Sequence, residues 1–153
     1  MMSANTYEYN GFDNVPRDIV CVRVVEGVKS IAASAFTECH NLYSITIPNS
    51  VTIIGNFAFG ECRSLLTMKI PSSIKEIHEF AFSGCKRLSN IDIPIGVRKI
   101  NLFTFECCSN LEKIIIPSSV TEICEGAFYE CSNLVSISVK VQCGNVDDNI
   151  YLF

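Results

Sequence analysis

The stretch "IPSSVTEICEGAFYECSNL", residues 116–134, decides the fold because closely similar stretches recur along the chain. Residues 47–65 read "IPNSVTIIGNFAFGECRSL", and residues 70–88 read "IPSSIKEIHEFAFSGCKRL". The period is 23 residues without insertion, and it is marked by one cysteine in each copy: Cys39, Cys62, Cys85, Cys108 and Cys131. A repeat of fixed length predicts a solenoid, in which each copy forms one coil and like residues stack on like.

Each copy contains one segment that is typical of a β-strand. Ile45 and Ile47 flank Thr46, so both isoleucines face the same side, and Pro48 ends the strand because it lacks an N–H donor. The rest of the copy predicts a return arm of extended chain and short 3-10 or helical turns near Ala-Phe. Stacked copies give a parallel sheet of about six strands, counted from residues 19–25. Since helical turns are wider than strands, the sheet is expected to line a concave side.

The repeats occupy residues 19–139, and the pattern weakens on both sides. Residues 1–18 match poorly and are expected to form an N-terminal cap, because an uncapped coil would expose its core. Residues 140–153 align as a degenerate last coil, which is expected either to cap the solenoid or to meet a second copy in a homo-oligomer. The residues of such an oligomer contact would be Val141, Ile150, Tyr151, Leu152 and Phe153.

The composition is that of a globular protein, with 48% hydrophobic and 18% charged residues. The 12 Lys and Arg form no run and the net charge is −4, which argues against a nucleic-acid partner. No apolar stretch is long enough for membrane insertion, and the N-terminal residues lack the pattern of a secretion signal. A cytoplasmic protein with reduced thiols is expected, and membrane association or surface exposure by an unconventional route is the alternative.

The motif L-x-x-I-x-I-P-x-S-V-x-x-I-x-x-x-A-F-x-x-C resembles the BspA-like (Treponema pallidum-type) class of the leucine-rich repeat family. The resemblance covers residues 19–139 and implies an α/β-type leucine-rich repeat solenoid, a right-handed superhelix that binds other proteins. The commoner leucine-rich repeats have Asn or Cys after the strand, whereas Pro48 stands there in this chain. Several BspA-like proteins are linked to cell surfaces, so the resemblance also implies a cell-surface adhesin for host matrix proteins as an alternative.

Residues between the inward positions of the strands are the candidates for binding a protein partner on the concave face. Most of them are polar or charged, as a solvated face requires. Ile115, Leu66 and Tyr43 are apolar and mark a contact, although single exposed apolar residues are also ordinary on protein surfaces. The partner-binding candidates are Arg23, Tyr43, Thr46, Leu66, Lys69, Asp92, Glu112, Lys113, Ile115 and Val135.

The spacing of the cysteines favours neither a disulfide framework nor a zinc site. Stacked cysteines lie within disulfide distance, but their side chains point in parallel, so a column of small buried thiols is expected. The densest cysteines are Cys107, Cys108, Cys124 and Cys131. They contain no C-x₂-C pair, so no zinc site is predicted.

No motif in the sequence indicates catalysis. The only histidines, His40 and His78, lie in no nucleophile motif, and no glycine-rich phosphate loop or paired-carboxylate motif occurs. No enzyme and no cofactor are therefore expected. The sequence predicts a non-catalytic protein-interaction scaffold, with a surface adhesin and a thiol-rich redox or metal-binding protein as the alternatives.

Overall fold

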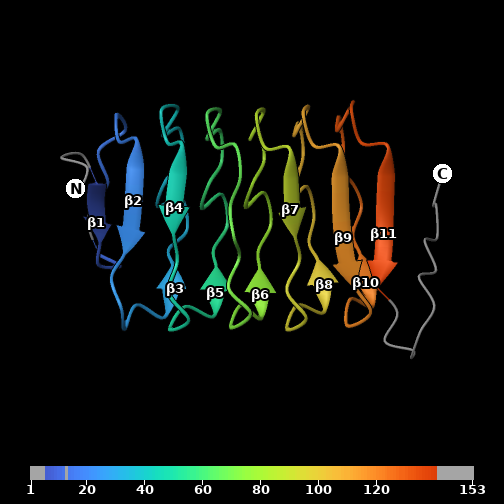
Figure 1. Cartoon of the computed structure of the whole chain (residues 1–153), viewed down its shortest axis with the longest axis horizontal. Coiled ribbons are helices and arrows are strands. Elements are labelled where there is room, and N and C mark those ends of the chain that lie inside the picture. Colours follow the sequence, from blue (N-terminus) through green and yellow to red (C-terminus); the bar gives the residue numbers. More distant parts are fainter. Residues whose placement is uncertain (1–5, 13, 141–153) are drawn as a thin grey trace.

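The computed structural model describes residues 6–12 and 14–140, which form coils stacked along one axis (Figure 1). One side of the stack, called the strand face below, carries β1 (Thr6–Tyr9), β2 (Cys21–Val24), β4 (Ser44–Thr46), β7 (Asn90–Asp92), β9 (Lys113–Pro117) and β11 (Ser136–Lys140). The opposite side, called the back arm, carries the two-residue strands β3 (Ser30–Ile31), β5 (Ile53–Ile54), β6 (Glu76–Ile77), β8 (Lys99–Ile100) and β10 (Glu122–Ile123).

Neighbouring coils pair in parallel at an offset equal to the length of the repeat. Val22 pairs with Ile45 across β2 and β4, and Ile91 pairs with Ile114 across β7 and β9. All four residues are buried, while the residues beside them on each strand are more exposed. The parallel-strand solenoid predicted from the repeat is confirmed, because equivalent positions of adjacent copies meet in the sheet.

The third coil departs from the regular strand pattern. Residues 65–70 were expected to form a strand, but they contribute one isolated parallel bridge, from Thr67 to Asn90. The strand face is therefore divided into two sheets, β1-β2-β4 and β7-β9-β11. Met68 stands at the inward position that Ile45 occupies one coil earlier, and unbranched side chains favour a pleated strand less than β-branched ones do.

The strand β1 lies outside the repeats and extends the sheet beyond β2. Tyr7 pairs with Val22 and Tyr9 with Val24, an offset that differs from the repeat length. Tyr9 is 1% exposed, its ring meets Phe36 edge-on at 5.0 Å, and its hydroxyl accepts a hydrogen bond from the Ala32 N–H at 3.2 Å. The 23-residue pattern did not indicate this strand, because β1 reaches the sheet through a shorter connection.

The back arm contains no helix among the described residues, so the expected 3-10 or helical turns are not confirmed. Each repeat instead places residues in the left-handed region four positions apart, as Phe57 (φ 53°) and Glu61 (φ 58°) do. A left-handed residue interrupts a right-handed helix, and a bulky one costs about 1–3 kcal/mol. The chain therefore folds into short turns, such as the one closed by the Gly60 N–H and the Phe57 carbonyl at 2.9 Å.

A column of phenylalanines fills the interior of the coils. Neighbouring rings of this column are parallel within 11°, and their centroids are 5.3 to 5.6 Å apart. Its members are Phe36, Phe59, Phe82, Phe105 and Phe128. Ala58 and Ala81, each fully buried, precede two of these rings and leave room for the backbone to approach the core.

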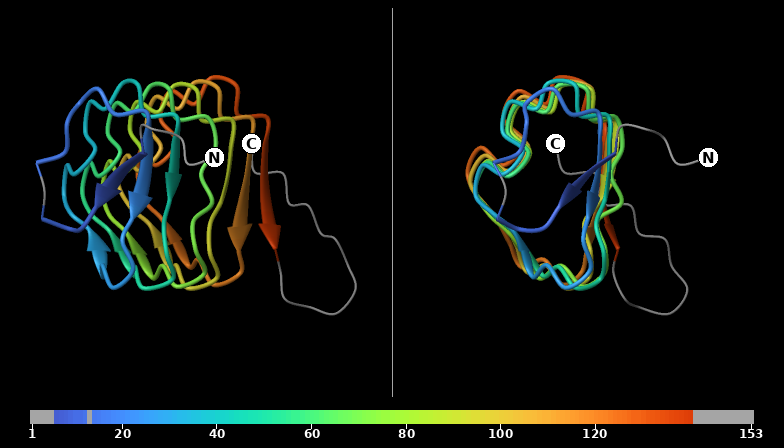
Figure 2. Two further views of the ribbon diagram at one scale, coloured as in Figure 1. Left: turned by 60° about the vertical axis from the view of Figure 1, so that its left-hand side comes forward. Right: turned by 90° about the vertical axis from the view of Figure 1, so that its left-hand side faces the viewer.

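The coils project closely onto one another when the stack is viewed from its end (Figure 2). Both arms are extended where they pair, and strands repeat at about 4.8 Å on either side of the coil. The curvature expected from a wide helical arm is therefore small, and the strand face runs nearly straight along the stack.

Truncating one inward ring tests the assignment of the two faces. Phe82→Ala should lower the free energy of unfolding by about 3–5 kcal/mol, because it leaves a cavity between two stacked rings. Thr67→Ala, on the exposed side of the same repeat, should change it by less than about 0.5 kcal/mol. Urea unfolding of both variants measures the difference, and equal losses would show that the inward and outward faces are wrongly assigned.

Candidate interaction surface on the strand face

Outward side chains of successive coils form a row along the strand face. Arg23 is opposite Thr46 in the ladder of β2 and β4, and Asp92 is opposite Ile115 in the ladder of β7 and β9. Lys69 occupies the same repeat position in the third coil. Four of these five side chains are exposed, and Ile115 is half-buried. Alternation along each strand points them away from the core.

Three of the candidate residues line one hollow in the strand face. Thr46, Lys69 and Asp92 border a space of about 900 Å³. Its apolar wall consists of the last inward isoleucines and the prolines that follow them, namely Ile47, Pro48, Ile70, Pro71, Ile93 and Pro94. The hollow spans the place where the strand face is divided between β4 and β7. It presents one cation, Lys69, and two anions, Glu26 and Asp92, beside an apolar wall, an arrangement that fits an extended stretch of polypeptide.

A second row lies just before the strands and is apolar toward both ends of the solenoid. Tyr43 is 48% exposed and Val135 is 64% exposed, while Leu66 is half-buried and Glu112 is exposed. Val20, which the sequence pattern did not single out as a contact, belongs to this row and is 43% exposed. Its carbonyl accepts a hydrogen bond from the Tyr43 N–H at 2.8 Å. The apolar members of the row, Val20, Tyr43, Leu66 and Val135, are called the apolar rim of the strand face.

The remaining candidates lie away from the hollow. Arg23 forms an ion pair with Glu8 of β1, which ties it to the first strand. Lys113, on β9, is exposed and lies nearer the last coil. The residues proposed for an oligomer contact fall outside the described part of the chain: Val141, Ile150, Tyr151, Leu152 and Phe153.

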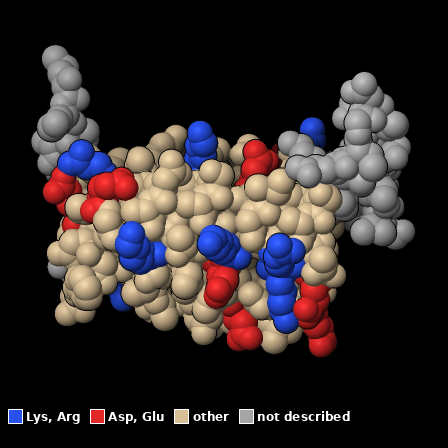
Figure 3. Space-filling model, turned by 90° about the horizontal axis from the view of Figure 1, so that it is seen from below, with Lys and Arg blue, Asp and Glu red and all other residues tan. Residues whose placement is uncertain are grey.

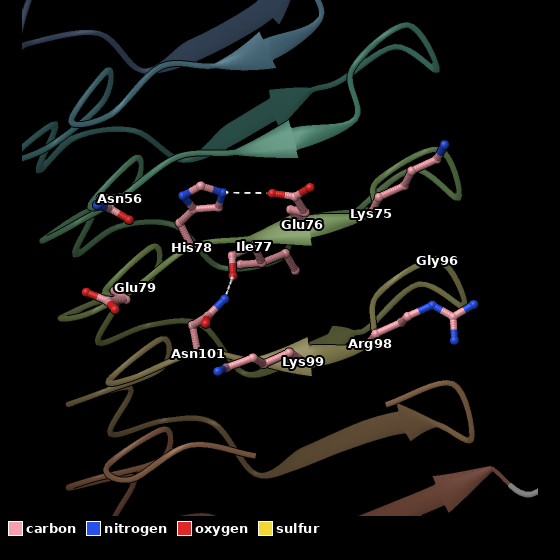
Figure 4. A pocket seen from close by; sticks show the side chains of 10 residues that line it. All are labelled: Asn56, Lys75, Glu76, Ile77, His78, Glu79, Gly96, Arg98, Lys99 and Asn101. Carbon is pink, nitrogen blue, oxygen red and sulfur yellow. Dashed lines mark hydrogen bonds and ion pairs between the residues drawn. The ribbon is translucent and has the colours of Figure 1, made fainter. Parts of the chain in front are cut away.

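A second hollow, of about 630 Å³, lies on the back arm between β6 and β8 (Figure 4). His78 Nε2 and Glu76 Oε2 are 3.2 Å apart, and Asn101 Nδ2 donates to the Ile77 carbonyl at 2.7 Å. Lys75 and Arg98 lie at one end of the hollow. The sequence pattern did not indicate this site, because its polar residues stand at variable positions of the repeat.

Charges of both signs are mixed on the side shown in Figure 3. Basic side chains are spaced along the long axis, and acidic ones lie beside them. Lys99 Nζ is 2.8 Å from Glu122 Oε1 in the next coil. This mixture matches the absence of a basic run in the sequence.

The described residues offer no arrangement typical of a metal centre. Within residues 6–12 and 14–138, no group of three or more His, Cys, Asp or Glu side chains could hold an ion. His40 Nδ1 is 3.0 Å from the Glu61 carbonyl oxygen, and His78 contacts Glu76. These partners of the two histidines are a backbone carbonyl and a carboxylate, and neither is a hydroxyl or thiol nucleophile. No helix in the described part of the chain is long and apolar enough to cross a membrane.

The cysteine column forms hydrogen bonds between coils. In each of four coils the thiol donates to the carbonyl of the core phenylalanine one coil earlier, at 3.0 to 3.2 Å. The same carbonyl also accepts the N–H of the cysteine of its own coil, as Phe59 does from Cys62 at 3.2 Å. All eight cysteines of the described part are free thiols. The thiol column thus links successive coils without disulfides.

Burial makes these thiols poor nucleophiles. Burial raises the pKa of Cys62, Cys85 and Cys108 well above the ordinary value of 9.0, and it raises the pKa of Cys131 to about 11. Cys107, near the surface, has its pKa raised to about 11, first by burial and then by its hydrogen bond to Glu130. Because the thiolate is the reactive form, none of these cysteines is activated as a nucleophile at neutral pH.

The chain matches the BspA type leucine rich repeat region over residues 29–152, with six copies. This protein belongs to the BspA-type leucine-rich repeat family. The match covers most of the sequence and agrees with the parallel solenoid. Leucine-rich repeat proteins are generally protein-interaction scaffolds and are typically not enzymes.

Solved structures of bacterial leucine-rich repeat proteins resemble this BspA-type solenoid. The T. pallidum leucine-rich repeat protein is 34% identical, with a TM-score of 0.72, over 78% of this chain and 57% of that chain. A leucine-rich repeat protein from Eubacterium ventriosum is 31% identical, with a TM-score of 0.70, over 81% and 33% respectively. One from Bacteroides ovatus is 25% identical, with a TM-score of 0.64, over 89% and 40%.

This chain thus spans between about a third and three-fifths of the length of those structures. No curated protein matches the sequence at a significant level.

The buried thiols predict how the stability of this BspA-type solenoid depends on pH. In the unfolded chain a cysteine ionises near pH 9, whereas the pKa of Cys85 in the folded state lies well above that value. The folded state then holds more protons, so the free energy of unfolding should fall above pH 9, by about 1.4 kcal/mol per pH unit for each such thiol. Below pH 9 the contribution of each thiol is constant.

Urea unfolding between pH 8 and about pH 10.5 measures this slope. Cys85→Ala should make the slope less steep by the contribution of one thiol, and Thr67→Ala, which removes no thiol, should leave it unchanged. An unaltered slope in Cys85→Ala would contradict the raised pKa.

Proposed function

We propose that this protein is a non-catalytic scaffold that binds an extended segment of a partner protein along the strand face. The observation that carries the proposal is the hollow in which Thr46, Lys69 and Asp92 meet beside a wall of prolines. The segment would place apolar side chains against Pro48 and Pro71. It would pair an acidic side chain with Lys69 and a basic one with Asp92.

The apolar rim adds a reason for recognition on this face. Tyr43 and Val20 lie in adjacent coils at the edge of the strand face, and each is more than two-fifths exposed. Tyrosine is enriched among residues that dominate binding energy, and apolar contacts surrounded by polar residues are typical of protein interfaces. Membership of a family of interaction scaffolds supports the same role.

The absence of catalysis is part of the proposal. The repeating residues of the described coils serve stacking, and the raised pKa values of the buried thiols argue against the redox alternative. The strand face would serve equally in an adhesin that binds host matrix proteins. Antibody staining of intact and permeabilised cells separates an adhesin from an intracellular scaffold, since only an adhesin is stained without permeabilisation.

Charge reversal in the hollow tests the proposed binding site. The full chain is used as bait in lysates of its own and of host cells, and a captured protein is then titrated by calorimetry. Lys69→Glu combined with Asp92→Lys should weaken the affinity at least about tenfold, because both charge pairs become repulsive. Tyr43→Ala should weaken it further.

The matched control is Lys75→Glu combined with Glu76→Lys, which reverses two exposed charges on the back arm. It should leave the affinity unchanged. If this control loses the partner and the strand-face variant retains it, the strand face is not the binding site.

A further inference from the structure

A second ladder of aromatic rings lies on the outside of the back arm, separate from the core column. The centroids of Phe57 and Phe80 are 4.5 Å apart, those of Phe80 and Phe103 are 5.1 Å apart, and the rings are nearly parallel. Phe57 is 41% exposed, and the other two rings are half-buried. We call Phe57, Phe80 and Phe103 the outer ladder.

The outer ladder occupies a backbone position that phenylalanine fits poorly. Phe57, Phe80 and Phe103 have φ of 53°, 56° and 53°, a region in which bulky side chains are rare. Ser34 and Gly126 hold the same position in the coils on either side, also with positive φ. The fold therefore accepts small residues at this position. Three consecutive phenylalanines where small residues suffice point to a role other than folding.

The two ends of the outer ladder differ. At one end, a Cβ atom added to Gly126 would lie 2.3 Å from Cε1 of Phe103, so the glycine backbone packs directly against the ring. At the other end, the position next to Phe57 is held by the small Ser34, and Phe57 is the most exposed ring of the three. The ladder is thus a bounded apolar strip that is closed at Gly126 and open beyond Phe57.

The segments that carry the outer ladder contain charged residues of a single sign, although cations from adjoining segments, such as Arg63 and Lys86, lie next to them. The equivalent segments of five coils, residues 33–38, 56–61, 79–84, 102–107 and 125–130, contain six glutamates and no Lys, Arg or His. The glutamates are Glu38, Glu61, Glu79, Glu106, Glu125 and Glu130. Glu61 pairs with Arg63 at 2.9 Å and Glu106 accepts from Ser83 at 2.8 Å. Glu79 and Glu125 are exposed beside the ladder positions Phe80 and Gly126.

We propose that the outer ladder and its glutamates form a second interaction surface, which binds a basic and apolar segment of a partner protein. Apolar side chains of the segment cover the exposed ring edges, and its Lys or Arg side chains pair with Glu79 and Glu125. A cation can also lie over the open face of Phe57. The charge complementarity selects a basic segment over an acidic one, and the surface lies on the side opposite the proposed strand-face site.

Titration of the isotope-labelled full chain with a defined probe tests this surface by NMR. The probe is a short soluble peptide in which Lys and Leu are separated by Gly and Ser. The comparison peptides replace every Lys by Glu or every Leu by Ser. The Lys-Leu peptide should shift amide signals of residues 56–61, 79–84 and 102–107, and both comparison peptides should bind at least about tenfold more weakly.

Two variants of the protein separate the outer ladder from non-specific attraction. Phe57→Asn combined with Phe80→Asn and Phe103→Asn should raise the Kd for the Lys-Leu peptide at least about tenfold. Asparagine accepts the left-handed conformation, so this variant should fold. Glu79→Gln combined with Glu125→Gln changes only exposed side chains, and it should raise the Kd and reduce its dependence on salt. Lys69→Ala on the strand face should leave the Kd unchanged.

Several results would overturn the proposal. These are no binding of the Lys-Leu peptide at millimolar concentration, an unchanged Kd in both ladder-side variants, or signal shifts confined to the strand face. Self-association of the wild type that the triple asparagine variant abolishes would show that a second copy covers the ladder, which also overturns it. Lys69→Ala changes only the strand face, so these results test the outer ladder separately from the strand-face binding proposed above.

Discussion

The constant length of the coil is the constraint on which the other contacts depend. Each inward residue stacks on the residue one repeat away, so Phe59 meets Phe82 at 5.3 Å and the Cys85 thiol reaches the Phe59 carbonyl at 3.2 Å. One inserted residue would shift the rings, the thiols and the parallel ladders out of register together. The repeat is therefore a packing requirement, since no coil can bury its core without a neighbour of the same shape.

This constraint explains which parts of the fold could be predicted from the sequence. The inward positions Val22, Ile45 and Ile91, and the cysteine column, follow from a period of 23 residues, because stacking requires similar side chains at equal intervals. The strand β1 could not be predicted in this way, since Tyr9 reaches Val24 through a connection of different length. The interrupted third strand also escaped the pattern, because Met68 satisfies the hydrophobic period while favouring a strand less.

The candidate site could be predicted only in part, for a physical reason. Outward residues of a strand are determined by alternation, so the exposure of Thr46, Lys69 and Asp92 followed from the inward isoleucines. Their position in one hollow, where the strand face is divided, was not indicated by the repeat. The outer ladder was missed because positive φ at Phe80 runs against the preference of its residue type, so no local rule indicated its conformation.

The two surfaces of the coil are subject to different physical limits. On the strand face, an outward side chain can change in size or charge with little effect on packing, so its chemistry is free to match a partner. On the back arm, the Phe103 ring occupies the space that a Cβ atom at Gly126 would need, and every bulky residue in the outer ladder carries the strain of a left-handed conformation. Ring stacking at 4.5 and 5.1 Å offsets part of that strain only when neighbouring coils carry rings together. A ladder of this kind is therefore stable as a block of adjacent coils. A single phenylalanine at the same position would bear the strain without the stacking, so the three rings form one structural unit.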